Sequence, residues 1–372
     1  MPEMSANEEL RDASISHAVN LSRYTNNVVR RMIGVLNRSD ARLADELRKA
    51  LEGISAGTFK AERLESLLVS VRNVINEAYS ALGEELTAEL KEFAGYEAQW
   101  QELAIKDVLP VSVSVASVTG AQVYAAAMAR PFQGVLLKGA LKDLDQLTAR
   151  KIRQAIAQGF VEGRTTDQII RDVMGTKAKG YADGLLERSR RDVEAIVRTA
   201  VSHTAGVAQD EVMKANDDLV KAVVWSATLD LRTSETCRVR DGKQYHPVTH
   251  KPIGHSLPWL GGPGRAHWRC RSSQVPVLKS WKELGIDLEG EANQASTRAS
   301  LDGQVPAETT YAEWIRQQSS QRKIEILGPT RARLLDEGGL KLEDLYSQRG
   351  EYLTLPQLRE RDMAAFKRAG LE

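Results

Sequence analysis

The 372-residue sequence is poor in aromatic residues and cysteine, and its positive and negative charges nearly cancel. Aromatic residues make up only 5%, which, with plentiful Ala, Leu, Arg and Glu, favours helices over a large β-sandwich. Two cysteines cannot supply the disulfide framework of a small secreted domain. A net charge of +1 excludes a globally basic protein, so any surface for nucleic acid has to be a local patch.

Long apolar runs and common catalytic loops are also missing. No stretch of about 18 apolar residues suggests a membrane span. The first residues, MPEMSANEELRDAS, are polar and acidic, unlike a signal peptide. Neither a Walker A loop nor a G-x-G-x-x-G motif occurs. We therefore expect a protein made in a reducing cytoplasm, without membrane contact.

Residues 1–105 predict an elongated N-terminal helical arm. Two stripes of five apolar residues recur at helical spacing. The first consists of Val28, Val29, Met32, Ile33 and Leu36. The second, with a heptad-like step, consists of Leu64, Leu67, Val71, Val74 and Ala78. A break near Gly53 and Gly57 separates them. The pattern fits either two helices packed as a hairpin or an arm that docks on a partner.

Residues 106–188 predict a helical connector domain. Its first part, Val111–Val115, alternates with period two, as a short strand or an extended connector does. Helices are expected over 122–130 and 141–159. Thr165 and Gln168 have the spacing of a capping box, which predicts a helix that ends at Gly175.

Residues 189–282 predict a core of one long helix followed by short strands and loops. The helix, 189–216, has an apolar stripe that His203 adjoins, and a strand begins at 222–225. Residues 283–372 predict a linker, polar from 284 to 308, and then an extension of short helices separated by glycines. The expected fold class is therefore mainly α with a small α+β core.

The stretch 225–276 concentrates residues that carry chemistry. It holds both cysteines, four of the six histidines and three of the six tryptophans. His267-x-x-Cys270 has a spacing that places two ligands on one side of a turn, and Cys237 could join them around zinc. A fourth ligand could be His246, His250 or His255. Structural zinc sites usually show two short ligand pairs, so the alternatives are two cysteines packed side by side without metal, or a disulfide.

The same residues allow a catalytic interpretation that we consider weaker. Cys270 and His267 could form a nucleophile set with Asp230 or Asp241, or the histidines and acids could serve a metal-dependent nuclease or peptidase. No nucleophile elbow surrounds Cys270, and the paired histidines with asparagine that such nucleases usually have are missing. The sequence therefore favours a protein that is not an enzyme.

Positive charge gathers in the same stretch. Residues 222–279 contain nine Lys or Arg against three acids, a local net charge of +6. Phosphate contact by such a patch would be salt-dependent and blind to sequence, and tryptophans could stack on bases. The alternative is that the arginines pair with nearby or partner carboxylates. The candidate nucleic-acid or partner-binding residues are Arg232, Arg265, Arg269, Arg271 and Trp268.

These clusters resemble the phage Mu F-like minor head proteins, also called phage head morphogenesis proteins. The resemblance is carried by Arg198-Thr199, Trp225-x-Ala-Thr-x-Asp230-x-Arg232, Cys237, Asp241-Gly242, Gly262-Pro263, His267-x-x-Cys270-Arg271 and Pro276. A tail from Trp314 to Leu355 resembles an extension found in many members. The resemblance covers roughly residues 140–360. Many members have a further Cys after the Cys-Arg pair, where this chain has Ser272.

The resemblance implies a low-copy structural protein of the phage head, located in the virion capsid after assembly in the host cytoplasm. Its implied partners are the major capsid protein and the portal protein, with packaged DNA as a further candidate. Two alternatives stay open at this point: an internal DNA-binding or ejection factor, and a metal-dependent nuclease or peptidase. No cofactor is implied, apart from the zinc considered above.

Overall fold

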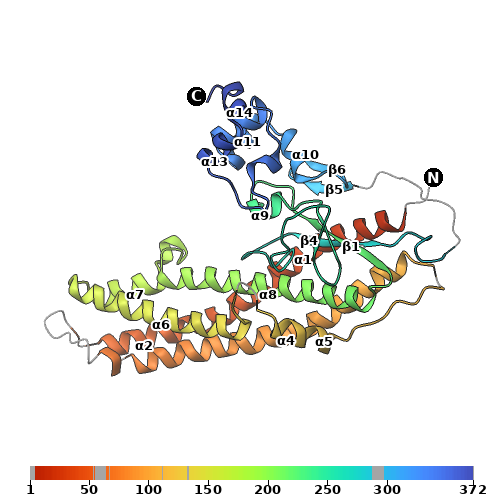
Figure 1. Cartoon of the computed structure of the whole chain (residues 1–372). Coiled ribbons are helices and arrows are strands. Elements are labelled where there is room, and N and C mark those ends of the chain that lie inside the picture. The colour runs from red at the N-terminus through yellow and green to blue at the C-terminus, as the bar shows by residue number, and fades with distance from the viewer. Residues whose placement is uncertain are drawn as a thin grey trace. The chain divides into compact units, whose positions relative to one another are not determined.

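Figure 1 shows the computed structural model of the chain, which describes residues 5–52, 54, 64–66, 68–110, 112–131, 134–286 and 297–371. The chain divides into two compact units, each assembled from separate segments. The sheet unit comprises Met1–Ser22, Ala94–Val123 and Ser202–Glu372. The helical unit comprises Arg23–Phe93 and Tyr124–Val201. Helices dominate and accompany one small four-stranded sheet, which confirms the fold class expected from the sequence.

Four helices contribute residues to both units: α1 (Ala6–Asn37), α4 (Val69–Asp107), α5 (Gly120–Ala129) and α8 (Leu185–Ala215). The helical N-terminal arm is confirmed, because α1 has 32 residues and α4 has 39. At 1.5 Å per residue these helices are about 48 Å and about 58 Å long. None of the helices within the described ranges is long and apolar enough to cross a membrane.

The helical unit packs α1 and α4 antiparallel. Tyr24 donates a hydrogen bond to Glu89 at 2.6 Å and stacks on Phe93 at 4.7 Å. Towards the other end of the pair, Arg38 donates to Glu85. The predicted second stripe is buried at Leu64, Val71, Val74 and Ala78, whereas Leu67 lies outside the described residues. Within this unit the arm is therefore a packed helical hairpin.

The remaining elements of the helical unit are α2 (Asp40–Leu51), α6 (Leu137–Val161), α7 (Thr166–Met174) and the 3-10 helix η1 (Lys177–Lys179). The capping box is confirmed: Gln168 N donates to Thr165 Oγ1, and Thr165 N donates to Gln168 Oε1 at 2.8 Å. The helix ends at Gly175, whose φ of 91° suits glycine. The capping box thus marks the start of α7, and Gly175 marks its end.

The sheet unit contains an antiparallel sheet in the order β3-β2-β1-β4. Its strands are β1 (Val220–Ser226), β2 (Gln244–Tyr245), β3 (Pro252–Ile253) and β4 (Ser273–Leu278). Trp225 and Tyr245 lie fully buried on adjacent strands, in a cluster with Leu10, Ile105 and Val212 from α1, α4 and α8. The predicted long helix and the strand after it are both present. The sheet is therefore covered by apolar side chains from three helices that are distant in sequence.

After the sheet, a hairpin of β5 (Thr297–Ser300) and β6 (Gly303–Pro306) leads into short helices. These are α10 (Tyr311–Arg316), α11 (Ser320–Leu327), α12 (Pro329–Asp336), the 3-10 helix η2 (Leu342–Leu345), α13 (Leu355–Arg361) and α14 (Met363–Arg368). Their apolar faces meet around Trp314 and Leu345, in a cluster that includes Leu229 and Val239 from the core segment. The short-helix extension thus shares one hydrophobic core with the loops after β1.

Two segments differ from the sequence-based expectation or refine it. Residues 284–308 were expected to be a polar linker, but 297–306 form the β5–β6 hairpin, while 287–296 lie outside the described residues. Buried Arg298 connects this hairpin to the core, because it donates a hydrogen bond to Asp241. Of the predicted strand or connector at 111–115, Val111 lies outside the described residues, and the rest is a turn and an extended connector.

Gly120 permits a close helix approach that can be tested. A Cβ at this position would lie 2.6 Å from Gly95 Cα and 2.8 Å from Gly95 N, both of which are backbone atoms. We expect Gly120→Ala to lower the free energy of unfolding by about 1–3 kcal/mol, because the helices must move apart. Urea denaturation followed by circular dichroism measures the change.

The matched control is Gly139→Ala in α6, where an added Cβ meets nothing within 4 Å. This change should raise stability by about 0.5–1 kcal/mol, because alanine costs less backbone entropy in a helix than glycine. Equal stability changes for the two variants would contradict the close-approach argument.

Candidate functional site: a buried Cys-His-Cys cluster beside an arginine-rich loop

Cys237, His267 and Cys270 come together in the sheet unit and form what we call the Cys-His-Cys cluster. Cys237 lies in the short helix α9 (Glu235–Arg238), which Ser234 caps by accepting a hydrogen bond from Cys237 N. His267 and Cys270 lie in the loop before β4, and Cys270 N donates to His267 O at 3.2 Å. The turn predicted from the His-x-x-Cys spacing is therefore present.

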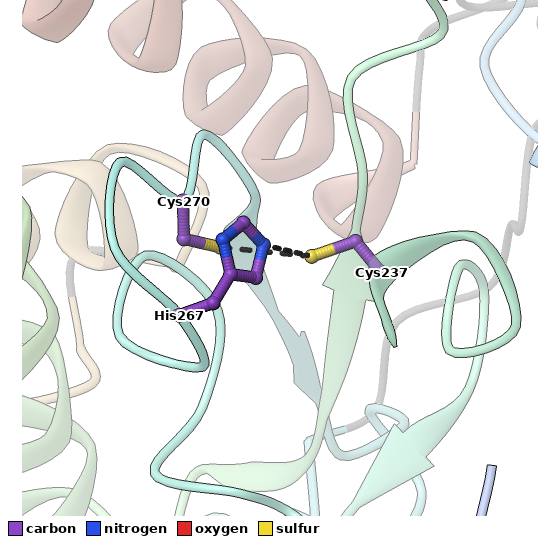
Figure 2. Close-up of side chains that lie close together, drawn as sticks. All are labelled: Cys237, His267 and Cys270. Atoms are coloured by element: carbon purple, nitrogen blue, oxygen red, sulfur yellow. Dashed lines mark hydrogen bonds between the residues drawn. The ribbon is translucent and has the colours of Figure 1, made fainter. Parts of the chain in front are cut away.

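The three side chains point toward one another (Figure 2). The sulfurs of Cys237 and Cys270 are 3.6 Å apart, and Cys237 Sγ is 3.3 Å from His267 Nε2. All three potential ligand atoms lie within 4.8 Å of one another. Both cysteines are free thiols and almost fully buried. The cluster can therefore hold a metal ion, or one cysteine can share a proton with the other.

Hydrogen bonds orient the imidazole of His267. Its Nδ1 lies 3.0 Å from the carbonyl oxygen of Trp268, to which it donates. When the ring is neutral, that bond places the proton on Nδ1 and directs the Nε2 lone pair at the sulfurs and at Ser234 Oγ, which is 2.7 Å away. A neutral histidine with this tautomer is the form that binds metals.

The two thiols differ in acidity. Hydrogen bonding to Cys270, together with burial, raises the pKa of Cys237 well above its usual value. The hydrogen bond from Cys237 lowers the pKa of Cys270 well below its usual value against the opposing effect of burial, and His267 lowers it further. Cys270 is therefore the more acidic of the two hydrogen-bonded sulfurs.

The other candidate histidines do not join this cluster. His246 Nδ1 accepts hydrogen bonds from Val248 N and Thr249 N, and His255 Nε2 donates to Gln244 O at 2.8 Å. His250 stacks on Trp259, with ring centroids 4.6 Å apart. Each of the three is held in the β2–β3 region by these contacts. The structure thus brings together three of the residues considered for zinc.

The two aspartates considered for catalysis bind arginines. Arg271 donates to both carboxylate oxygens of Asp230, at 2.6 and 2.8 Å. Asp241 is buried and accepts from Ala227 N and Tyr311 N, each at 2.6 Å, and from Arg298. The Nδ1 partner of His267 is a backbone carbonyl, so the geometry does not assemble a Cys-His-Asp relay.

Asp241 connects three parts of the sheet unit. Burial raises the pKa of its carboxyl above the ordinary value, although Arg298 and the two backbone N–H groups oppose that rise. Arg298, itself 7% exposed, also donates to the carbonyl oxygens of Thr309 and Ala227. The sequence offers little sign of this pairing, because Arg298 lies in a polar segment 57 residues after its partner.

Arg265 is buried in a second ion pair. It donates to both oxygens of Asp210, at 2.6 and 3.1 Å, and Gln274 Nε2 donates to the same carboxylate at 3.1 Å. Gly206 makes room, since a Cβ there would lie 2.9 Å from Arg265 Nε. Sequence reasoning missed Asp210 and Gln274. The available signal was Gly206 four residues before Asp210, which places a small residue and an acid on one helix face.

The remaining candidate binding residues lie at the surface. Arg232, Arg269 and Arg271 are exposed, and Trp268 is 41% exposed. Asp230 joins the two loops that contain them, because it accepts from Arg232 N as well as from Arg271. Arg269 has φ of 59°, a conformation uncommon for residues other than glycine. We call these four residues, Arg232, Trp268, Arg269 and Arg271, the Arg-Trp surface.

The fold and site together define a mainly helical protein in which a small sheet and a buried Cys-His-Cys cluster support an arginine-rich loop. Residues 150–275 match the family model described as Phage Mu protein F like protein, a region that begins within α6 and ends within β4. This region, about a third of the chain, is similar to the phage Mu F-like family, which suggests a phage head morphogenesis protein. The family implies a location in the phage head.

No curated protein and no solved structure matches the chain. The family match includes all three residues of the Cys-His-Cys cluster and all four of the Arg-Trp surface.

The Asp210–Arg265 pair predicts a pH-dependent contribution to stability. Burial would raise the pKa of Asp210, but Arg265, His250 and Gln274 outweigh it and hold the pKa below the ordinary value. We expect Asp210→Asn to lower the free energy of unfolding by about 3–5 kcal/mol at pH 7, because Arg265 is left buried without its countercharge. Urea denaturation between pH 7 and pH 3 measures this difference.

The sign follows from the depressed pKa of Asp210 in the folded state. Its stabilisation is complete above the unfolded pKa of about 4 and is lost as the pH falls through the folded value. The gap between wild type and Asp210→Asn should therefore narrow only at acidic pH. Exposed Asp217→Asn serves as a control, with an expected change within about 0.5 kcal/mol. A gap that stays constant down to pH 3 would contradict the assignment.

Proposed function

We propose that this chain is a minor structural protein of the phage head that acts in head assembly by contacting the major capsid protein, the portal protein, or both. The observation that carries the proposal is the match of residues 150–275 to the phage Mu F-like family. In this proposal the protein is not an enzyme, and it reaches the virion through contacts with its partners.

The Arg-Trp surface supports a contact role for the matched region. Tryptophan and arginine are enriched where proteins bind one another, because one side chain offers large apolar area and the other planar hydrogen-bond donors. Trp268 and Arg269 are adjacent and exposed. They directly follow His267 and precede Cys270, so the buried cluster fixes the backbone that presents them. We propose that a capsid or portal surface with carboxylates binds here.

The proposal is tested by locating the chain in heads of a phage that encodes it. Mass spectrometry of purified heads should detect the chain, and heads made without it should be fewer or misassembled. Absence of the chain from heads, together with normal assembly without it, would refute the proposal.

A double variant tests whether the Arg-Trp surface itself makes the contact. Trp268→Ala combined with Arg269→Ala should reduce the copies of the chain per head several-fold, because exposed hot-spot residues typically contribute about 1–2 kcal/mol each to binding. Quantitative mass spectrometry of heads measures the copy number. The matched control is Arg316→Ala on α10, an exposed arginine outside the surface, which should leave the copy number unchanged. Equal incorporation of both variants would rule out the Arg-Trp surface as the binding surface.

Packaged DNA is the second candidate partner, favoured by the local net charge of +6 over 222–279. The structure engages several of these cations internally. Arg265 binds Asp210, and Arg240 donates to the carbonyl oxygens of Pro258, Thr236 and Arg349. Fewer side chains are then available to phosphates than the count suggests, and this favours a protein partner.

A gel shift with duplex DNA distinguishes the two partners. If DNA is bound, affinity should fall steeply between 50 and 200 mM salt, and Arg232→Ala with Arg269→Ala should reduce the slope by about one for every phosphate that the replaced side chains neutralise. No shift at low salt would exclude the DNA-binding alternative. A nuclease or peptidase role would require His267→Ala and Cys270→Ala to abolish any activity of the purified chain.

A further inference from the structure

We propose that Cys237, His267 and Cys270 bind one zinc ion, which fastens α9 to the loop before β4. The inference rests on the geometry of the Cys-His-Cys cluster and is independent of the proposed function. Two thiolates and one imidazole are the ligand types that zinc prefers, and they are less suited to calcium or magnesium. The two chain segments that supply them are separated by about thirty residues of loop and short strand.

The separations between the ligand atoms fit a tetrahedral metal site. With Zn–S near 2.3 Å and Zn–N near 2.0 Å, tetrahedral angles place two sulfurs about 3.8 Å apart and a sulfur about 3.5 Å from the nitrogen. The corresponding distances here are 3.6 Å and 3.3 Å. A disulfide would instead require sulfurs about 2.0 Å apart. The third pair, Cys270 and His267, lies within 4.8 Å. Two of the three separations therefore already match a tetrahedral site to within a few tenths of an ångström.

The surroundings prepare the imidazole for metal binding. Trp268 O accepts from His267 Nδ1 and so fixes the tautomer in which Nε2 has a free lone pair. Ser234 Oγ lies 2.7 Å from Nε2 and can turn its hydroxyl away when an ion binds. Both cysteines are at most 2% exposed, so zinc held here would be shielded from bulk water. This shielding indicates a structural rather than a hydrolytic role.

In this proposal Ser272 lies where the fourth zinc ligand would be. Its side chain is buried, and its interaction with the Cys237 sulfur lowers the pKa of that thiol. The hydroxyl of Ser272 would complete four-coordination, because the cluster offers three strong ligands. A thiolate at residue 272 would therefore add a fourth strong ligand without rebuilding the loop.

A bound ion would add to the buried arginine contacts that hold this loop-rich region. Between β3 and β4, a stretch that the structure describes in full, the chain has turns and loops but no helix, and α9 spans only four residues. Arg269, in the left-handed region, sits between two of the three ligands. The zinc would then fix the backbone on both sides of Trp268 and Arg269.

The test uses the full chain, purified without chelators. Elemental analysis should find about one zinc per chain, and Cys270→Ala should lose it. Replacing zinc with cobalt(II) should give the near-ultraviolet charge-transfer absorption of thiolate ligands. The matched control is His255→Ala, a histidine of the same segment outside the cluster, which should retain both zinc and the cobalt spectrum.

A variant expected to bind zinc more tightly distinguishes loss of the metal site from misfolding of the protein. Ser272→Cys should bind zinc at least about tenfold more tightly in a competition with a chromophoric chelator, because a thiolate replaces a weak oxygen ligand. Zinc content no higher than that of Cys270→Ala, together with a cobalt spectrum lacking thiolate bands, would overturn the proposal. A Cys237–Cys270 disulfide in the freshly alkylated protein would also overturn the proposal. An unchanged zinc affinity of Ser272→Cys would do the same.

Discussion

The buried carboxylate of Asp241 is the interaction on which the sheet unit depends. It accepts hydrogen bonds from the backbone just after β1, from the first residue of α10 and from Arg298 in the β5–β6 hairpin. A charge without water is costly unless every lone pair has a partner, and here three chain segments supply those partners. The short C-terminal helices are consequently joined to the sheet by polar contacts as well as by their apolar core.

The same principle explains the arginines of the loop region. Arg265 and Arg240 are almost fully buried, and each is surrounded by carboxylate or carbonyl oxygens. Internal pairing of this kind holds loops that contain few apolar residues. It also separates the arginines that build the loop from those that reach its surface, Arg232, Arg269 and Arg271. Charge counted along the sequence cannot make that distinction.

Sequence patterns predicted the features that depend on neighbouring residues. The apolar stripe of α8, the capping box at Thr165 and the His267-x-x-Cys270 turn all have a local signature, and all are present. Contacts between distant polar residues have little local signature. Arg298 lies in a polar segment that predicted a linker, and only Gly206 hints at the pairing of Asp210. The convergence of Cys237 with Cys270 was open from sequence, since the two residues are 33 positions apart and two short strands lie between them.

The division of the sheet unit among three segments constrains how the chain can be made. Leu10 and Ile105 leave the ribosome early, whereas their neighbours Val212, Val223 and Leu278 follow much later. During synthesis the early residues have no core to enter, so apolar surface stays exposed until the last segment appears. The helical unit is complete by Val201 and can fold first. The core of the sheet unit therefore cannot be completed until β4, with Leu278, has been synthesised.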